Sequence, residues 1–281
     1  MKTKLVLSRR LLLLSATLLA TLLSGCTILP GTSVAKTASG WNQYGEAGAG
    51  SPVVIFEAGA GEGMSSWAKV YPEVARFTHA FAYSRDGHGL SAPVLYKRTG
   101  QNAVRDLRAL LTTRGIKPPY VLVGHSLGGV YMELFAKLYP AEVAGLVLVD
   151  TPHPDYSARM KEQFPGKYRI VQAIKVIGFT GALSAELIGL EATARQWHAA
   201  GPLPVVPTVM LTATKARKMD GAELVKLNHA LQTELAQSHA WIEQRFIDSS
   251  HYIQDEKPEA VITAIQQVVA RTRQVLPATA N

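Results

Sequence analysis

Residues 120–134 read Tyr-Val-Leu-Val-Gly-His-Ser-Leu-Gly-Gly-Val-Tyr-Met-Glu-Leu and decide the fold of this chain. The short apolar run 120–123 predicts a buried strand. After Ser126 the apolar side chains recur at helical spacing as far as Leu138, and Pro140 lies where such a helix should stop. The stretch therefore predicts a sharp strand-to-helix turn with Ser126 at the bend.

Ser126 is flanked by Gly124 and Gly128, where side chains would obstruct the close approach of the strand and the helix. A turn of this kind exposes the serine hydroxyl, and the start of the helix directs free N–H groups and a positive dipole end towards developing negative charge. A simpler interpretation is a glycine-rich loop with a serine that caps the helix. The strand and helix patterns on both sides favour Ser126 as a nucleophile.

The N-terminus has the pattern of a secretory signal. Lys2, Lys4, Arg9 and Arg10 precede the apolar stretch 11–23, which is short for a membrane-spanning helix. We therefore expect residues 1–25 to be a signal peptide, residues 26–40 to be a flexible tether, and residues 41–281 to form one domain.

The signal stretch ends in Leu-Ser-Gly-Cys at 23–26, which resembles the lipobox of bacterial lipoproteins. That resemblance implies that Cys26, the only cysteine, is acylated and begins the mature chain. It implies a lipid anchor at the cell envelope, in the outer membrane or on the periplasmic face, because Thr27 stands where an aspartate would favour inner-membrane retention. An ordinary signal peptide, which would give a secreted protein, and an uncleaved anchor are the alternatives.

The composition favours a globular protein without a nucleic-acid role. Of 281 residues, 47% are hydrophobic, enough for a sizeable core. The chain has 29 basic and 21 acidic residues, and loss of the four basic residues in the signal would reduce its net charge from +8 to +4. The basic residues are scattered without a dense cluster or interleaved aromatic side chains, so nucleic-acid binding has little support.

Strand-like runs alternate with helical spacers along most of the chain, which predicts an α/β fold: a mostly parallel central sheet with helices on both faces. Strands are predicted at 52–57, 79–84, 120–124, 146–150, 208–212 and 245–247. Helices are predicted at 65–75, 102–113, 127–138, 221–237 and 258–275. Residues 151–204 interrupt the alternation with helical patches, and we expect a small helical lid here, inserted after the strand that ends at Asp150. We call these residues the lid segment.

Four motifs in this framework resemble the α/β-hydrolase superfamily over about 41–273: Gly-His-Ser-Leu-Gly-Gly at 124–129, Leu-Val-Leu-Val-Asp at 146–150, Tyr-Ser-Arg-Asp-Gly-His-Gly-Leu-Ser at 83–91 and Ser-His-Tyr at 250–252. The closest similarity is to its lid-bearing members, the serine esterases and proline iminopeptidase-like enzymes. The order nucleophile, acid, histidine along the chain agrees with that group.

A serine hydroxyl needs a positioned base, and the resemblance assigns this role to His251, which follows a strand pattern and precedes the final helix. A surface loop histidine is the simpler interpretation. The competing histidines are His88, His125, His153, His229 and His239.

The resemblance also implies two backbone donors for the oxyanion of an acyl-transfer reaction. One is the N–H of Leu127, directly after the serine. The other is the N–H of Ala60, in the glycine-containing loop after the first predicted strand, at a place where the family usually has a histidine before the glycine. A phosphate cradle has little support here because the P-loop lysine is missing.

The acid departs from the commonest family pattern. An aspartate usually follows the strand corresponding to 208–212, but Ala216 stands near that place. Asp150, which ends the preceding strand, is our first candidate and Asp220 the second. Asp150 also has a simpler interpretation, as a residue that shapes the start of the lid segment.

The sequence therefore predicts a lipid-anchored serine hydrolase that cleaves a carboxylic ester, or less readily an amide, through an acyl-enzyme on Ser126; acyl transfer stays open. The lid segment offers an apolar pocket for a small acyl substrate through Tyr156, Met160, Phe164, Tyr168, Ile174, Ile177, Phe179, Leu183, Leu187 and Trp197. No metal or organic cofactor is implied. The alternative is a non-catalytic binding lipoprotein on the same scaffold, motivated by the missing aspartate.

Overall fold

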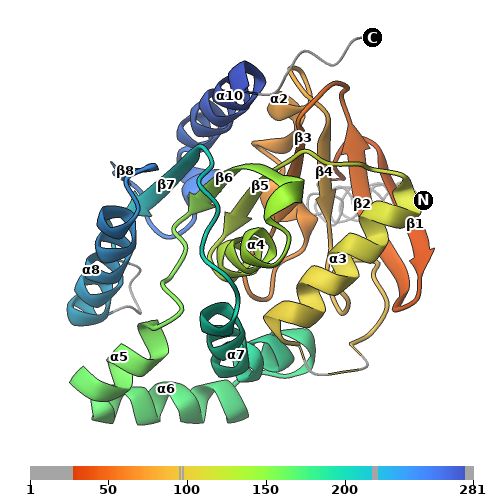
Figure 1. The fold of residues 1–281 in the computed structure, drawn as a ribbon. Coiled ribbons are helices and arrows are strands. Elements are labelled where there is room, and N and C mark those ends of the chain that lie inside the picture. The colour runs from red at the N-terminus through yellow and green to blue at the C-terminus, as the bar shows by residue number, and fades with distance from the viewer. Residues whose placement is uncertain (1–27, 95, 97, 217–220, 276–281) are drawn as a thin grey trace, which may run out of the picture.

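Both faces of the central strands are apolar, so the sheet lies in the middle of the molecule with helices on each side (Figure 1). The computed structural model describes residues 28–94, 96, 98–216 and 221–275. Within these ranges eight strands form one sheet in the order β1-β2-β4-β3-β5-β6-β7-β8. The strands are β1 (Thr32–Thr37), β2 (Gly40–Ala47), β3 (Val53–Glu57), β4 (Ala80–Tyr83), β5 (Tyr120–His125), β6 (Val143–Val149), β7 (Thr208–Ala213) and β8 (Ile242–Ile247).

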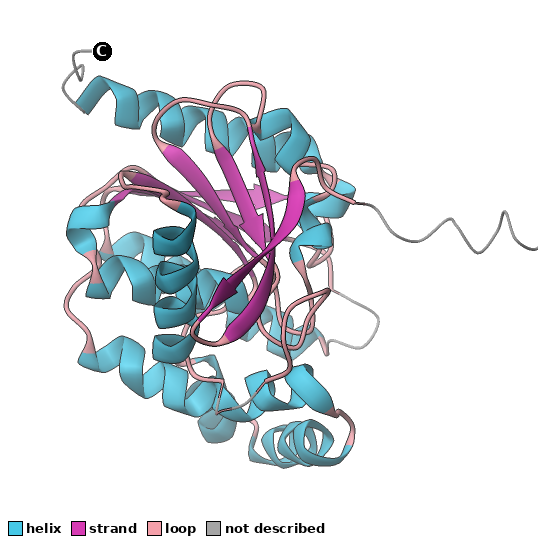
Figure 2. Ribbon diagram, turned by 90° about the vertical axis from the view of Figure 1, so that its right-hand side faces the viewer, coloured by secondary structure: helices cyan, strands magenta, loops and turns pink. Residues whose placement is uncertain are grey.

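The pairings of β1 with β2 and of β2 with β4 are antiparallel, and all the other neighbours in the sheet are parallel. The helical elements are η1 (Met64–Trp67), α2 (Tyr71–Val74), α3 (Gly100–Arg114), α4 (Leu127–Leu138), η2 (Pro140–Glu142), α5 (Tyr156–Gln163), α6 (Pro165–Ile177), α7 (Gly181–Ala199), α8 (Ala222–Ser238), α9 (Ile253–Glu256) and α10 (Pro258–Val275). Figure 2 shows helices on both sides of the twisted sheet. The predicted α/β fold class is confirmed.

Alternate residues of each central strand build two separate cores. In β5, Leu122 packs in the cluster that includes side chains of α3 and α4, whereas Val121 and Val123 pack in the cluster that includes α10. All six residues of β5 are buried. A strand buried on both faces has no polar side to alternate with, which explains why the sequence shows a continuous apolar run here.

The predicted tether is wrong for part of its length. Residues 32–37 form β1, which pairs with β2 along its whole length from Thr32↔Gly45 to Thr37↔Gly40, and Leu29 is buried. The two strands were missed because only Ala35 in β1 and Asn42, Tyr44 and Gly45 in β2 are fully buried, so the apolar signal is weak. Thr32, Val34 and Thr37 are nevertheless β-branched and suit a strand at the edge of a sheet.

Other predicted elements were right in kind but shifted at their ends. The helix predicted at 65–75 is divided into η1 and α2, β8 begins three residues before the predicted start, and β6 begins at Val143. The predicted helices at 127–138 and 258–275 have the observed bounds of α4 and α10.

The lid segment contains α5, α6 and α7, which leave the sheet after β6 and return to it at β7. Figure 1 shows these three helices together at the bottom of the view, below α4. Among the described residues, no helix combines the length and apolarity that a membrane span requires. The predicted signal peptide and Cys26 lie outside the described residues.

Candidate active site

Ser126 connects β5 to α4 in a backbone conformation that serine rarely adopts, with φ 52° and ψ −124°. Its N–H is held by the carbonyl oxygen of Val149 at 3.0 Å. A Cβ at Gly128 would lie 2.5 Å from the carbonyl oxygens of both Glu57 and Ala58, and a Cβ at Gly124 would lie 2.5 Å from Cα of Gly129. The two glycines therefore allow the tight turn, as the sequence predicts.

The structure brings His251 and Asp150 together although 101 positions separate them in the chain. His251 follows β8 and Asp150 follows β6, and Nδ1 of His251 lies 2.6 Å from Oδ2 of Asp150. The other carboxylate oxygen, Oδ1, accepts hydrogen bonds from the Ala213 N–H at 3.2 Å and from Nε2 of Gln232 at 3.3 Å. Asp150 is thus held from three sides.

These contacts keep Asp150 ionised. Burial by itself would raise the pKa of the carboxyl group, but the hydrogen bond and charge of His251, then the donors of Ala213 and Gln232, lower its pKa below the ordinary value of 3.8. An ionised carboxylate at this place fixes the proton of His251 on Nδ1 and leaves Nε2 as an acceptor.

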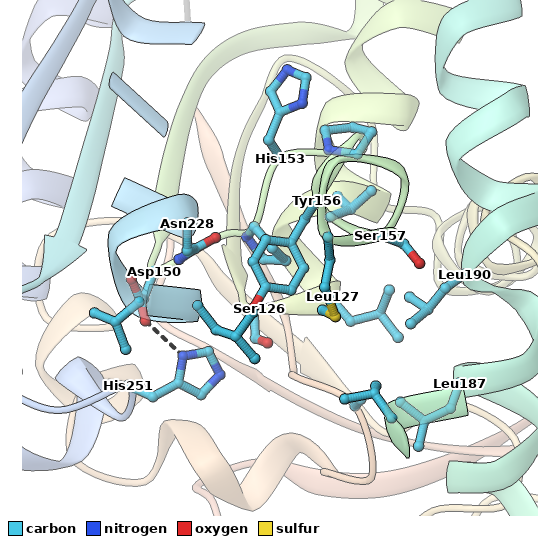
Figure 3. A pocket seen from close by; sticks show the side chains of 18 of the residues that line it. Ser126, Leu127, Asp150, His153, Tyr156, Ser157, Leu187, Leu190, Asn228 and His251 are labelled. Carbon is cyan, nitrogen blue, oxygen red and sulfur yellow. Dashed lines mark hydrogen bonds and ion pairs between the residues drawn. The ribbon is translucent and has the colours of Figure 1, made fainter. Parts of the chain in front are cut away.

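Ser126, Asp150 and His251 line one cavity of about 390 Å³ (Figure 3). Its wall contains residues that directly follow the carboxyl ends of several strands, and its opposite wall comes from the lid segment. The cavity therefore lies where parallel α/β sheets commonly bind ligands. Lid residues in the wall include Tyr156, Met160, Val171, Leu187 and Leu190.

Only part of the apolar set predicted for the lid segment reaches this cavity. Tyr156, Met160 and Leu187 line it, whereas Ile174, Ile177 and Phe179 are exposed. The remaining aromatic residues pack within the protein: Phe164 and Tyr168 against α8, and Trp197 against the core of α3 and α4. Helical spacing alone could not distinguish a side chain that lines the cavity from one that is exposed or one that packs elsewhere in the protein.

Leu127 and Ala60, the predicted oxyanion donors, both line the cavity. Leu127 is the first residue of α4, where backbone N–H groups have no partner inside the helix. Ala60 lies in the loop after β3, which Arg85 holds from behind: Nη1 donates to the Ala58 carbonyl at 2.7 Å and Nη2 donates to the Gly59 carbonyl at 2.6 Å. The loop is thereby fixed beside Ser126.

Arg85 belongs to a buried charge network that the sequence analysis missed. Its Nε donates to Oε1 of Glu186 at 2.8 Å, and its Nη1 also pairs with Glu57, which accepts a hydrogen bond from Tyr83. Glu186, on α7, accepts from the Gly61 N–H at 2.9 Å and lies 2.9 Å from Nε2 of His88. The sequence signal was limited to the polar residues Arg85, Asp86 and His88 within a motif otherwise noted for its family resemblance.

The pKa values of the two carboxyl groups in this network, Glu186 and Glu57, are shifted in opposite directions. Burial would raise the pKa of Glu186, but the charge of Arg85 and the hydrogen bonds of His88 and Arg85 lower it to about 2. For Glu57, burial outweighs the attraction of Arg85 and raises the pKa above 4.5. Glu186 is therefore the firmly ionised partner of Arg85.

The competing histidines contact residues other than Asp150, although His153 and His229 also line the cavity. His88 is bound to Glu186, and His125 lies between Glu62 and the backbone of His251. His229 contacts the Ala213 carbonyl and His239 the Leu235 carbonyl. His153 lines the cavity, where burial lowers its pKa, and no hydrogen bond joins it to Asp150 in the described structure. The second acid candidate, Asp220, lies outside the described residues.

Two further residues of the cavity wall were not predicted. Glu62 follows the Ala60 loop, and Asn228 on α8 has a side-chain oxygen that is buried without a hydrogen-bond partner among the described atoms. A buried acceptor of this kind is available to a donor on a ligand. Across the described ranges, no three His, Cys, Asp or Glu side chains are grouped to hold a metal ion.

The model of the alpha/beta hydrolase family matches residues 54–264. The uncharacterized protein YqjL of Bacillus subtilis is 28% identical over 224 residues, which cover 79% of this chain and 85% of that protein. A 2-hydroxy-6-oxononadienedioate/2-hydroxy-6-oxononatrienedioate hydrolase of Paraburkholderia phymatum is 36% identical over 112 residues, 38% of each chain.

Solved structures agree at the level of the fold. An enol-lactonase from Burkholderia xenovorans superimposes with a TM-score of 0.63 at 16% identity, covering 85% of this chain and 100% of its own. A thermophilic esterase from Thermogutta terrifontis gives a TM-score of 0.57 at 20% identity, covering 86% of this chain and 98% of its own.

Proposed function

Since this chain belongs to the alpha/beta hydrolase family and is an enzyme, we propose that it is a serine hydrolase that cleaves carboxylic esters through an acyl-enzyme on Ser126. The observation that supports this most is the 2.6 Å contact between Asp150 and His251 in the wall of the cavity that Ser126 also lines. Residues from three separate loops line this cavity, and their side chains are of the types that a nucleophile, base and acid relay requires.

The reaction would run in two acyl-transfer steps. Ser126 Oγ attacks the ester carbonyl carbon while Nε2 of His251 accepts the hydroxyl proton, and Asp150 stabilises the imidazolium that forms. His251 then gives the proton to the leaving alkoxide, so the alcohol departs and the acyl group stays on Ser126. A water molecule, deprotonated by His251, then attacks the carbonyl carbon of the acyl-enzyme; the acid leaves as His251 returns the proton to Ser126 Oγ, which restores the free enzyme.

Negative charge on the carbonyl oxygen would be stabilised by the N–H groups of Leu127 and Ala60. Both residues line the cavity, and the buried pairing of Arg85 with the Ala58 and Gly59 carbonyls keeps the second donor from moving during the reaction. Fixed donors at the developing charge cost no reorganisation at the moment of reaction.

The cavity favours a small acyl compound with an apolar part. Aliphatic, aromatic and proline side chains make up much of its wall, and about 390 Å³ suits a small-molecule ligand. Amide hydrolysis and acyl transfer use the same relay, so an ester is proposed on the ground that its leaving group needs the least assistance.

The alternative of a non-catalytic binding protein rested on the missing aspartate after β7. Asp150 instead lies within hydrogen-bond distance of His251. This contact supports Asp150 as the acid of the proposed relay, so the catalytic proposal does not need an aspartate after β7.

We also propose that Cys26 carries a lipid that anchors the enzyme at the cell envelope, with residues 1–25 removed. The support is the lipobox-like stretch 23–26 after a basic and apolar leader. Metabolic labelling with an alkyne fatty acid should mark the wild-type chain and not Cys26→Ser; equal labelling of both would refute the anchor.

The substrate proposal is tested with p-nitrophenyl esters of graded acyl length beside aminoacyl arylamides. We expect turnover of short and medium apolar esters by the wild type and loss of that turnover in Ser126→Ala. Ester turnover that Ser126→Ala retains in full would contradict the serine mechanism, and turnover of the arylamides alone would contradict the ester assignment.

A further inference from the structure

His125, the residue before Ser126, is enclosed with both ring nitrogens facing oxygen atoms. Its side chain is 1% exposed. Nε2 lies 3.0 Å from the carbonyl oxygen of His251, and Nδ1 lies 3.2 Å from Oε2 of Glu62. The imidazole ring also lies against the ring of His251, with 4.7 Å between the ring centres.

The two partners determine the protons on the ring. A backbone carbonyl oxygen can only accept a hydrogen bond, so Nε2 must carry a proton. A carboxylate oxygen is likewise only an acceptor, so Nδ1 must carry the second proton if Glu62 is ionised. A histidine with both nitrogens protonated is a cation, and Glu62 beside it supplies the opposite charge.

Glu62 is ionised under ordinary conditions. Burial would raise the pKa of this half-buried carboxyl group, but the hydrogen bond and charge of His125, the Gly59 N–H and the charge of His251 together lower it below 4.5. Asp255, on α9, faces the same group of charges; burial raises its pKa, which Lys69 and His125 partly offset. Glu62 is therefore the carboxylate that pairs with His125.

The same Glu62 oxygen also accepts a hydrogen bond from the Gly59 N–H at 3.1 Å. Glu62 and His125 thus join three separate parts of the site: the loop that carries Ala60, the turn that carries Ser126 and the loop that carries His251. Each part supplies one component of the proposed reaction.

We propose that Glu62 and His125 form a charged positioning pair. This pair holds the loop that carries Ala60, the turn that carries Ser126 and the loop that carries His251 in fixed positions relative to one another. This inference rests on the serine hydrolase function proposed above. Neither residue takes part in bond making; the pair acts through Gly59 and through the backbone of His251. Small displacements between such parts are enough to slow catalysis strongly.

The protonation state is tested directly by nitrogen NMR of the ¹⁵N-histidine-labelled protein at pH 7.5, with His125 assigned by its loss in His125→Asn. Two protonated ring nitrogens are expected for His125 in the wild type, and one unprotonated ring nitrogen in Glu62→Gln, which removes the charge. An unprotonated nitrogen in the wild type, or an unchanged doubly protonated ring in Glu62→Gln, would overturn the charged pair.

The positioning role is tested by steady-state kinetics on a p-nitrophenyl ester. Glu62→Ala should lower kcat about 10- to 100-fold with little change in KM, because supporting contacts act on geometry. Glu62→Gln, whose amide oxygen can still accept from Gly59, should recover part of that loss. Glu73→Ala is the matched control and should leave kcat unchanged, because Glu73 is an exposed carboxylate on α2 that pairs with Arg76.

The outcomes separate this inference from the proposed function. If Ser126→Ala is inactive while Glu62→Ala keeps the wild-type kcat, the serine mechanism stands and the positioning pair is refuted. A rise in KM at unchanged kcat would also refute it, because Glu62 would then be a substrate-binding group in the cavity wall. Full activity of Ser126→Ala would refute the function itself.

Discussion

Glu186 on α7 accepts a hydrogen bond from the Gly61 N–H at 2.9 Å, so a helix of the lid segment holds the loop that carries Ala60. The same carboxylate pairs with Arg85, which binds the Ala58 and Gly59 carbonyls from the other side. The position of α7 and the geometry of the proposed oxyanion site are therefore coupled through one buried ion pair. A displacement of α7 would disturb the loop as well as open the cavity.

This ion pair should contribute to stability in a pH-dependent way. The folded-state pKa of Glu186 is about 2 against 4.5 for the free side chain, so its contribution is complete above pH 4.5 and is lost as the pH falls towards 2. Glu186→Gln should lower the unfolding free energy at pH 7 by about 3 kcal/mol. Urea unfolding at pH 7, 4.5 and 3.5 should show the difference from wild type shrinking with acid.

Glu191→Gln is the control on the same helix, because Glu191 is exposed, and it should change the unfolding free energy by less than about 1 kcal/mol. A loss in Glu186→Gln that stays constant from pH 7 to pH 3.5 would show that the carboxylate charge is not the cause.

The buried carboxyl group of Glu133, on α4, should make stability fall as the pH rises, which is the opposite of the effect of Glu186. Burial raises its pKa to about 8, although Trp197 donates to its Oε2 at 3.0 Å and Lys137 lies near. The folded protein then keeps a proton that the unfolded chain releases, so stability should fall by roughly 1.4 kcal/mol per pH unit between about pH 5 and 8. Glu133→Gln still offers Trp197 an acceptor and should remove this slope. Thermal or urea unfolding across that range measures it, and an identical slope in both proteins would contradict the assignment.

Gly128 should tolerate no side chain. A Cβ there would meet the carbonyl oxygens of Glu57 and Ala58 at 2.5 Å, and both belong to β3 and the loop that follows it. Gly128→Ala should push that loop away from Ser126, lower kcat at least about 100-fold and reduce stability. Gly166→Ala is the matched control, because nothing lies within 4 Å of its added Cβ and α6 is helical there. Equal kcat in both variants would contradict the close approach.

The acid is tested by comparing Asp150→Asn with Asp220→Asn. Asparagine at 150 would still contact His251 but would favour the wrong imidazole tautomer and leave the imidazolium without its counter-charge, so kcat should fall about 10³- to 10⁴-fold. Asp220→Asn should retain the wild-type kcat. The reverse pattern in steady-state assays would move the acid role to Asp220.

The fold followed from the sequence where local pattern and burial agree. The turn around Ser126 and the two-sided apolar strands β5 and β6 were predicted because each residue there is constrained by packing on both faces. β1 and β2 were missed because they lie towards one edge of the sheet and are half exposed, so their stability comes from pairing with each other and with β4.

The candidate site could be predicted from the sequence less completely than the fold. Ser126 could be identified because the sharp turn requires glycines close to it on both sides. The choice between Asp150 and Asp220 depends on how the loops after β6 and β7 are placed relative to each other, and residue types alone do not determine that placement. The roles of Glu186 and Glu62 were invisible for the same reason: Glu186 meets Gly61 across 125 positions and Glu62 meets His125 across 63. Contacts at such separation arise from the tertiary fold alone.

The central claim is that Ser126 is an activated nucleophile. The most direct measurement is intact-protein and peptide mass spectrometry after treatment with a stoichiometric fluorophosphonate. One phosphonyl adduct per chain on Ser126 is expected in the wild type, with none in Ser126→Ala and much slower labelling in His251→Ala. A wild-type protein left unmodified, or modified at the same rate in Ser126→Ala, would contradict the account.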